Sequence, residues 1–427
     1  MGSSGGLVLI ACTIAALIWA NSPFAASYES IWDVGLEIGW GGYELRLSLH
    51  HFINDGLMAV FFFMVGLEIK REFMVGELAS ARKAALPIAA AFGGIVVPAG
   101  IYAVINAGTP GAPGWGIPMA TDIAFALGVL ALLGPRAPLA LKIFLAALAI
   151  VDDIGAVLVI AAFYTEQISV PALTAAGVIL LGMIALNRMG ARHPGFYLLF
   201  GVGLWFAFLQ SGIHATIAGV IAAMTIPART RIDTDEFLTR GKDLMQRFDD
   251  AGVEGKNVLT NHDQQAVIQT LENACEDAQA PLQRIEHDIQ LWVAFAIIPL
   301  FALANAGVNL SGDIGAALLD RVTLGVILGL VVGKPVGITF FAWLAVRSGM
   351  AALPVGVTWS SIHGVSWLGG IGFTMSLFIA NLAFTNDALR VEEAKIGILV
   401  ASLIAGLVGW MIIRRGAVPH PAPAPGD

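Results

Sequence analysis

The feature that most constrains this chain is an apolar run over residues 139–164 that contains two adjacent acids, Asp152 and Asp153. A helix needs about 20 apolar residues to cross a bilayer, and this run is longer. Acidic side chains inside such a segment are costly and usually mark a path for ions or protons. The alternative, two acids at a water-facing helix end, fits poorly because the pair lies near the middle of the run.

Composition places the whole chain among polytopic membrane proteins, since 57% of the residues are hydrophobic and only 13% are charged. The two cysteines do not form a disulfide framework. Residues 228–288 hold 7 Lys or Arg and 13 Asp or Glu, and therefore −6 of the net charge of −8. No basic patch indicates a nucleic-acid partner.

Apolar periodicity predicts an all-α polytopic membrane protein with about twelve transmembrane helices. The first eight spans occupy residues 1–227 and the last four occupy 289–414, with an acidic insert at 228–288 and a disordered tail at 415–427. The predicted spans are 7–22, 50–69, 84–106, 115–133, 139–164, 170–187, 195–210, 213–227, 289–306, 321–346, 356–384 and 392–413.

The distribution of basic residues predicts the orientation. With both termini in the cytoplasm, 18 of the 23 Lys and Arg residues fall in cytoplasmic segments and four fall outside. Such an excess agrees with the positive-inside rule, and the opposite orientation would violate it. The insert would then be cytoplasmic.

Two segments outside the spans have their own patterns. Apolar residues alternate over 34–47 on both sides of Gly41 and Gly42, which predicts an external β-hairpin. An isolated hairpin is marginal in water, so we expect it to pair with a second copy or to cover its own protomer. In the insert, 235–250 and 260–278 have the periodicity of amphipathic helices, the second with a cap-like start at Thr260.

Spans four and eleven carry helix-breaking sequence. Pro118 interrupts span four one turn before Thr121 and Asp122, and the glycine-rich stretch 369–376 interrupts span eleven. Irregular backbone at membrane depth survives only where protein buries it or where it lines a cavity. The pattern predicts an inverted repeat of spans three to five and ten to twelve, with a site where the broken helices cross. Two glycine-rich, closely packed helices are the alternative.

Lys334 lies near the centre of span ten, where a buried ammonium group needs a counter-charge. The available acids are Asp122, Asp152 and Asp153. Adjacent helix positions point about 100° apart, so one acid of the pair can face Lys334 while the other faces an ion cavity.

A small hard cation binds oxygen ligands, which Asp153, Thr121 and unwound carbonyl groups could supply. A buried carboxylate can hold a proton or a cation but not both, and this competition is sufficient for exchange. Asp122 would offset the partial charges of half-helix ends.

Three polar residues near span ends have two interpretations each. Asp55 is either an edge residue or part of an exit path, and Glu68 either an ordinary helix end or a functional group. His214, at the start of span eight, is either structural or a pH sensor.

The chain resembles the NhaA-type sodium/proton antiporter family, in which inverted repeats are an established feature. The similarity follows the family order across nearly all spans. The matching stretches are 54–62, 65–72, 120–134, 149–155, 211–216, 299–307, 333–335 and 370–376.

The resemblance implies an electrogenic exchanger of the bacterial inner membrane that moves protons inward and sodium or lithium outward, without a cofactor. It also implies a homodimer formed through the hairpin. The implied roles are ion and proton binding by Asp153, Asp152, Thr121 and Asp122, with sodium on the first three; an ion pair at Lys334; an external pathway at Asp55; and pH response at Glu68, Glu286 and His214.

Two other classes of protein deserve comparison. A sodium-coupled symporter of an organic solute could share this fold, but it would need a roomy cavity. An intramembrane aspartyl protease would need aspartates in Gly-x-Gly-Asp and Tyr-Asp motifs, which this sequence lacks. We therefore expect a transporter and not an enzyme.

Overall fold

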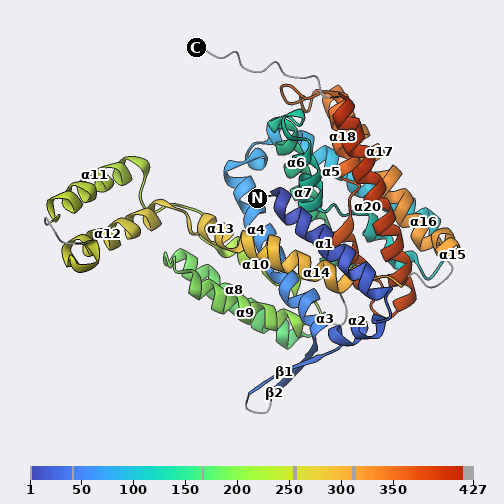
Figure 1. Cartoon of the computed structure of the whole chain (residues 1–427), viewed down its shortest axis with the longest axis horizontal. Helices are drawn as coiled ribbons and strands as arrows, with labels where there is room; N and C mark the ends of the chain where they lie inside the picture. The colour runs from blue at the N-terminus through green and yellow to red at the C-terminus, as the bar shows by residue number, and fades with distance from the viewer. Residues whose placement is uncertain (1, 41–42, 166–167, 253–256, 310–313, 417–427) are drawn as a thin grey trace.

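The computed structural model describes residues 2–40, 43–165, 168–252, 257–309 and 314–416. It is a bundle of helices from which a β-hairpin and a helical arm project (Figure 1). Within the described residues, eight helices are long and apolar enough to cross a membrane, or ten if each of two bent pairs forms one span. Two further apolar helices, Pro194–Leu209 and Thr216–Thr225, are shorter. The predicted fold, nearly all-helical with apolar helices long enough to cross a membrane, is confirmed, whereas the count of twelve spans stays a prediction.

The α-helices and strands are α1 (Gly2–Ala20), α2 (Ala25–Trp32), β1 (Gly35–Trp40), β2 (Tyr43–Ser48), α3 (Leu49–His51), α4 (Met58–Val75), α5 (Ala81–Ile105), α6 (Ile123–Leu132), α7 (Leu139–Phe163), α8 (Val170–Arg188), α9 (Pro194–Leu209), α10 (Thr216–Thr225), α11 (Thr234–Asp250), α12 (His262–Ala278), α13 (Pro281–Trp292), α14 (Ile298–Asn305), α15 (Ile314–Leu319), α16 (Arg321–Leu328), α17 (Lys334–Arg347), α18 (Trp359–Leu368), α19 (Phe373–Ala383) and α20 (Ala388–Gly416). Short 3₁₀- and π-helical segments join some of them: η1 (Phe52–Leu57, π), η2 (Glu77–Ala79, 3₁₀), η3 (Ala112–Met119, 3₁₀), η4 (Gly134–Arg136, 3₁₀), η5 (Val258–Thr260, 3₁₀), η6 (Val293–Ile297, π) and η7 (Gly329–Gly333, π).

The predicted hairpin is confirmed. Strands β1 and β2 pair antiparallel, with Gly35 opposite Ser48 and Trp40 opposite Tyr43. The pair extends away from the helical body (Figure 1). Gly41 and Gly42 lie outside the described residues, and the external position of the hairpin stays a prediction.

Helices α5 and α17 cross at two glycines. A Cβ atom on Gly93 would lie 2.2 Å from the carbonyl oxygen of Gly337, and a Cβ on Gly337 would lie 2.2 Å from that of Gly93. Small residues permit such close backbone approach between membrane helices. The crossing holds α17, which begins with Lys334, firmly against α5.

Two irregular stretches meet inside the bundle. Residues 120–122 are not helical and separate η3 from α6, while 369–372 separate α18 from α19, which differ in direction by 46°. The Asp122 amide donates a 2.7 Å hydrogen bond to the Ile371 carbonyl oxygen. The sequence breaks thus lie against each other, and whether their helices form an inverted repeat stays a prediction.

Some predicted boundaries were wrong. The helix leading into span nine begins at Pro281, eight residues before the predicted start, because the segment from 281 to 288 continues the helix as α13. Helix α12 is capped by Asn261 and not Thr260, since the Asn261 side chain accepts hydrogen bonds from the amides of Asp263 and Gln264. Helix α20 continues to Gly416, and residues 417–427, which include most of the predicted tail, lie outside the described residues.

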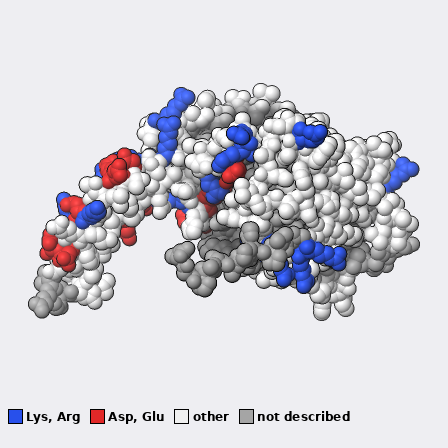
Figure 2. Space-filling model, turned by 90° about the horizontal axis from the view of Figure 1, so that it is seen from above, with Lys and Arg blue, Asp and Glu red and all other residues white. Residues whose placement is uncertain are grey.

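Helices α11 and α12 form the helical arm and pack against each other. They lie where the sequence predicts amphipathic helices. Acidic and basic side chains alternate along the arm, whereas most of the visible surface of the body is uncharged (Figure 2). This contrast is expected when one part of a chain lies in water and the other in lipid.

Candidate functional site

An ion pair lies in the interior of the bundle. Lys334 Nζ pairs with Asp152 Oδ2, and both side chains are completely inaccessible to solvent. The ammonium group also donates a 2.9 Å hydrogen bond to Thr121 Oγ1. Burial of a single charge here would be very unfavourable, so the two groups stabilise each other.

Thr121 connects this ion pair to both irregular stretches. Its hydroxyl oxygen lies 2.5 Å from Asp152 Oδ2 and 2.8 Å from the carbonyl oxygen of Gly369. The hydroxyl has one hydrogen, which it donates to either acceptor, while its lone pair accepts from Lys334. Thr121 therefore forms hydrogen bonds with Asp152 and Lys334, and none joins it to Asp153 in the described structure.

Asp122 caps two helices at once. Its Oδ1 accepts a 2.9 Å hydrogen bond from the amide of Phe125 in the first turn of α6. Its Oδ2 accepts from the amide and the hydroxyl of Thr374, at 3.1 and 2.6 Å, in the first turn of α19. Helix N-termini carry partial positive charge, so they offset part of the negative charge of this carboxylate.

Asp153 is the acid that remains without compensation. Its side chain is almost fully buried, and neither carboxylate oxygen has a hydrogen-bond partner among the residues that the structure describes. An ionised carboxylate in such surroundings is strongly destabilised unless a cation or a proton neutralises it. The preceding residue, Asp152, also has one buried oxygen, Oδ1, without a hydrogen-bond partner in the described structure.

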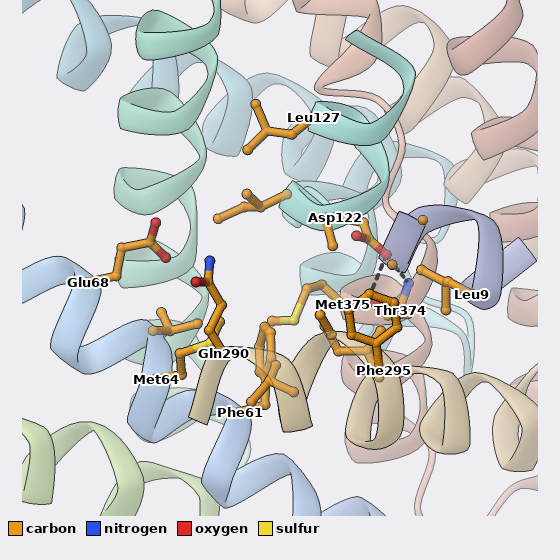
Figure 3. A pocket seen from close by; sticks show the side chains of 18 of the residues that line it. Leu9, Phe61, Met64, Glu68, Asp122, Leu127, Gln290, Phe295, Thr374 and Met375 are labelled. Carbon is orange, nitrogen blue, oxygen red and sulfur yellow. Dashed lines mark hydrogen bonds between the residues drawn. The ribbon is translucent and has the colours of Figure 1, made fainter. Parts of the chain in front are cut away.

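A cavity of about 190 Å³ lies beside Asp153. Glu68 of α4 and Gln290 of α13 face it from one side, and Asp122 and Thr374 from the other (Figure 3). The remaining wall is mostly apolar and includes residues of α1, α4, α6 and η6. The volume is enough for several water molecules, so the cavity can hold a partly hydrated ion.

A second cavity, of about 790 Å³, lies beside Asp55 and His214. Asp55 forms a 2.8 Å ion pair with His51, one helical turn before it. His214 Nε2 lies 2.6 Å from the carbonyl oxygen of Tyr164, a bond that fixes the imidazole at the cavity wall. Asp55 and Glu68 are 13 positions apart in the same continuous helical segment, about 20 Å along its axis.

Three buried phenylalanines lie between the helices that line the two cavities. Phe62 and Phe378 have ring centroids 5.4 Å apart, and Phe301 and Phe378 are 6.4 Å apart. Phe378 lines the second cavity. Phe61, the neighbour of Phe62, and Met375, three residues before Phe378, line the cavity beside Asp153. A closely packed aromatic layer without polar atoms opposes the passage of an ion.

Arg71 brings together two of the residues expected to respond to pH. Its guanidinium group forms a 2.6 Å ion pair with Glu286 and lies 3.6 Å from Glu72 and 3.9 Å from Glu68. His214 does not join this group, because it lines the other cavity. The three sequence-predicted positions are therefore divided between two regions.

Sequence reasoning missed two residues of this arrangement. Thr374 holds Asp122 from the opposite broken helix, and Arg71 links two acids that are distant in the sequence. Arg71 was visible as part of a charged cluster at the end of span two. Thr374 had no local signal apart from its place after the glycine-rich break.

Comparison with known proteins places the chain in context. A family model described as Na+/H+ antiporter 1 matches residues 1–413. Among similar curated proteins, Na(+)/H(+) antiporter NhaA 2 of Syntrophotalea carbinolica is 53% identical over 97% of this chain and 94% of its own length. Na(+)/H(+) antiporter NhaA of Acidithiobacillus ferrooxidans is also 53% identical, over 98% of this chain and 97% of its own length.

Proposed function

We propose that this chain, which belongs to the Na+/H+ antiporter 1 family and is a multi-pass membrane protein, exports sodium or lithium ions in exchange for protons at Asp153. The observation that carries the proposal is the isolation of this carboxyl group. It is buried beside a cavity, and the described residues offer it neither a hydrogen bond nor an ion pair.

Competition for one carboxylate explains the exchange. Asp153 is neutral when it holds a proton and is neutralised again when it holds a sodium ion, whereas the empty carboxylate is strongly disfavoured in this environment. The site therefore changes sides only when it is occupied. Release of one ion requires uptake of the other, which is the condition for coupled antiport.

Electrogenic exchange requires a second group that changes its charge during the cycle. The Asp152–Lys334 pair is the nearest candidate, because Asp152 precedes Asp153 and has one oxygen without a partner in the described structure. A cation that binds this oxygen weakens the attraction between Asp152 and Lys334 and favours loss of a proton from this pair. The cycle then moves more than one proton for each sodium ion.

Alternating access is supported by the two cavities and the aromatic layer between their helices. The cavity beside Asp153 and the cavity beside Asp55 do not share a lining residue. Closure on one side and opening on the other would expose Asp153 to each solution in turn. The crossing at Asp122 and Ile371, where both backbones are irregular, is the element that we expect to move.

The chain would lie in the inner membrane of a bacterial cell. The charge distribution supports an orientation with both termini in the cytoplasm. The cavity beside Asp55 then faces outward and is part of the external pathway. The cavity beside Asp153 and Glu68 faces inward. The arm formed by α11 and α12 lies in the cytoplasm.

The cluster of Arg71 with Glu68, Glu72 and Glu286 supports a role in pH response for Glu68 and Glu286. Glu68 lines the cavity beside Asp153, and Arg71 links it to Glu286 at the start of span nine. Protonation of either acid weakens its attraction to Arg71 and alters the charge at the inner entrance. His214 would respond to pH on the external side.

The hairpin supports a homodimer. Strand pairs with an exposed edge can add a strand from a second chain, and β1 and β2 form a two-stranded sheet that projects from the body (Figure 1). Two copies joined in this way would form a four-stranded sheet, which is more stable than an isolated hairpin.

An organic solute fits this site poorly. Pockets for small organic molecules have volumes of about 300–1,000 Å³. The cavity beside Asp153 is smaller, about 190 Å³, and its wall offers few polar groups apart from carboxylates. These properties favour a small cation over a symported solute.

The test uses everted membrane vesicles that hold a proton gradient, monitored with a pH-sensitive dye. Addition of sodium or lithium chloride should collapse the gradient in the wild type and leave it intact in Asp153→Asn. Potassium or choline chloride should have little effect. A gradient that collapses equally in Asp153→Asn would remove this residue from the site, and no sodium response at any pH would refute antiport.

A further inference from the structure

A ring of hydrogen bonds lies beside the cavity that contains Asp55, and its members have no role in the cation site. The ring joins His50 of α3, Asn54 of η1 and Asn305 at the end of α14, and Asn381 of α19 is attached to it through a hydrogen bond to Asn305. Asn305 is completely buried, whereas His50, Asn54 and Asn381 line the cavity. Four polar side chains among apolar helices need mutual hydrogen bonds, and here every one has them.

The orientation of Asn305 follows from a backbone contact. Its Nδ2 donates a 2.9 Å hydrogen bond to the carbonyl oxygen of Phe301, which can only accept. The second Nδ2 hydrogen goes to Asn54 Oδ1, at 2.9 Å. Asn305 Oδ1 is then an acceptor, and Asn381 Nδ2 donates to it at 2.7 Å.

These directions determine the protonation state of His50. Its Nε2 lies 3.2 Å from Asn305 Oδ1 and must donate, because an amide oxygen has no hydrogen. Asn54 Nδ2 lies 3.3 Å from both ring nitrogens of His50 and must donate, because Asn54 Oδ1 already faces Asn305. Since Nε2 carries the hydrogen, Nδ1 is the nitrogen that accepts. The ring therefore closes only around a neutral imidazole that carries its hydrogen on Nε2.

The ring lies directly next to the aromatic layer along the same helices. Asn305 follows Phe301 by one turn of α14, and Asn381 follows Phe378 by three residues of α19. Helix α19 also carries Thr374, which holds Asp122 at the crossing. A change in the ring thus reaches the aromatic layer and the crossing through one rigid helix.

We infer that this ring, together with the attached Asn381, is the latch that keeps the aromatic layer closed, and that protonation of His50 from the cavity opens it. His50 and the three asparagines are positioning residues for transport and do not bind the cation. The inference rests on the proposed function, because it assigns the latch to the side from which protons enter.

Protonation of His50 breaks the ring for a geometric reason. Nδ1–H would face the Asn54 amide nitrogen, which places two donors together. Rotation of the Asn54 amide relieves this clash but moves its nitrogen against Asn305 Nδ2. Rotation of Asn305 in turn loses the bond to Phe301 and places its nitrogen against Asn381 Nδ2. No arrangement of the three amides satisfies a doubly protonated His50.

Other charged groups surround His50. His51 and Asp55 lie on its own helical segment, His214 precedes α10, and Glu392 and Lys395 come from α20. Asp33, at the end of α2, also influences His50 electrostatically. From α14 and α19 the ring itself presents only the Asn305 and Asn381 amides. Among these groups, His50 is the one with hydrogen bonds to Asn54 and Asn305 in the described structure, and Asn305 in turn links it to Asn381.

The test measures exchange of labelled sodium against unlabelled sodium at equal concentration in right-side-out membrane vesicles. Sodium self-exchange involves no net proton movement, so the proton gradient does not drive it. The internal pH is held at about 8.5, and the external pH is varied from about 8 to about 5.5, the range in which histidine titrates. The variants are His50→Gln, which retains a donor and an acceptor but does not titrate, and His51→Gln as the matched control.

The ratio of the wild-type rate to the His50→Gln rate should rise about fivefold as the external medium is acidified, the factor expected for loss of one hydrogen bond of about 1 kcal/mol. Proton competition at Asp153 cancels in this ratio because both proteins have the carboxylate. His51→Gln should follow the wild type. A ratio that stays constant across the pH range would overturn the latch.

Hydrogen–deuterium exchange of α14 and α19 in lipid nanodiscs gives a second readout that does not require transport. Amides at the ends of these helices should exchange faster in the wild type than in His50→Gln at about pH 5.5 and equally fast at about pH 8. Equal protection at both values would refute the latch even if a variant were inactive. Absence of sodium exchange in the wild type would contradict the proposed function but not this second measurement.

Discussion

Replacement of Lys334 by alanine should be strongly destabilising, and the structure indicates by how much. The substitution leaves Asp152 buried, with Thr121 as its one remaining hydrogen-bond donor in the described structure. Removal of one partner of a buried ion pair costs about 3–5 kcal/mol because the other charge stays without compensation. We expect a loss of this size in the free energy of unfolding.

A double-mutant cycle separates this effect from lost packing. In Lys334→Ala/Asp152→Asn, no uncompensated charge remains, so about half or more of the lost stability should return. Unfolding of the purified protein in mixed detergent micelles can be followed through the fluorescence of its 10 tryptophans. Lys83→Ala, which removes an ammonium group with a 62% exposed side chain, is the control and should change stability by no more than about 0.5 kcal/mol.

The reasoning would be refuted if Lys334→Ala were as stable as the Lys83 control, or if the added Asp152→Asn change made the protein still less stable. The first result would mean that the ion pair contributes nothing to folding. The second would mean that Asp152 stabilises the fold through contacts other than Lys334.

Two other substitutions and one deletion test the architecture. Asp122→Ala removes three hydrogen bonds at two helix N-termini and should lower the unfolding free energy by about 3–5 kcal/mol, measured in the same unfolding experiment. Gly337→Ala places a Cβ atom 2.2 Å from the Gly93 carbonyl oxygen and should reduce folded yield severalfold in detergent extracts, whereas Gly100→Ala, in open space on α5, should not. Deletion of residues 35–48 should convert a dimer into a monomer on native mass spectrometry and leave sodium exchange at least partly active; a persistent dimer would place the interface elsewhere.

The positions of the long apolar helices could be predicted because the length of an apolar run reflects the thickness of a bilayer. The two acids in α7 illustrate what the local sequence does not predict. Helical geometry indicates that Asp152 and Asp153 point in different directions, but it does not indicate which one faces Lys334. That choice depends on how α7 packs against α5, which in turn packs against α17, and this is a property of distant parts of the chain.

The same limit explains the residues that were missed. The capping of α19 by Asp122 joins residues 252 positions apart, and the hydrogen bonds around His50 join three helical segments. Local sequence contains no signal for either. The π-helical turns at η1, η6 and η7 were also invisible, because insertion of one residue into a helical turn leaves composition unchanged. Hairpin alternation and helix amphipathicity, which are local, were predicted correctly.

Competition at Asp153 is the central claim, and proton release on sodium binding tests it most directly. Purified protein in weakly buffered solution at alkaline pH is titrated with sodium chloride, and the heat of binding is compared in buffers of different ionisation enthalpy. The account predicts about one or more protons released for each sodium ion bound in the wild type and in Asp55→Asn, and neither binding nor release in Asp153→Asn. Sodium binding without proton release, or release that persists in Asp153→Asn, would contradict it.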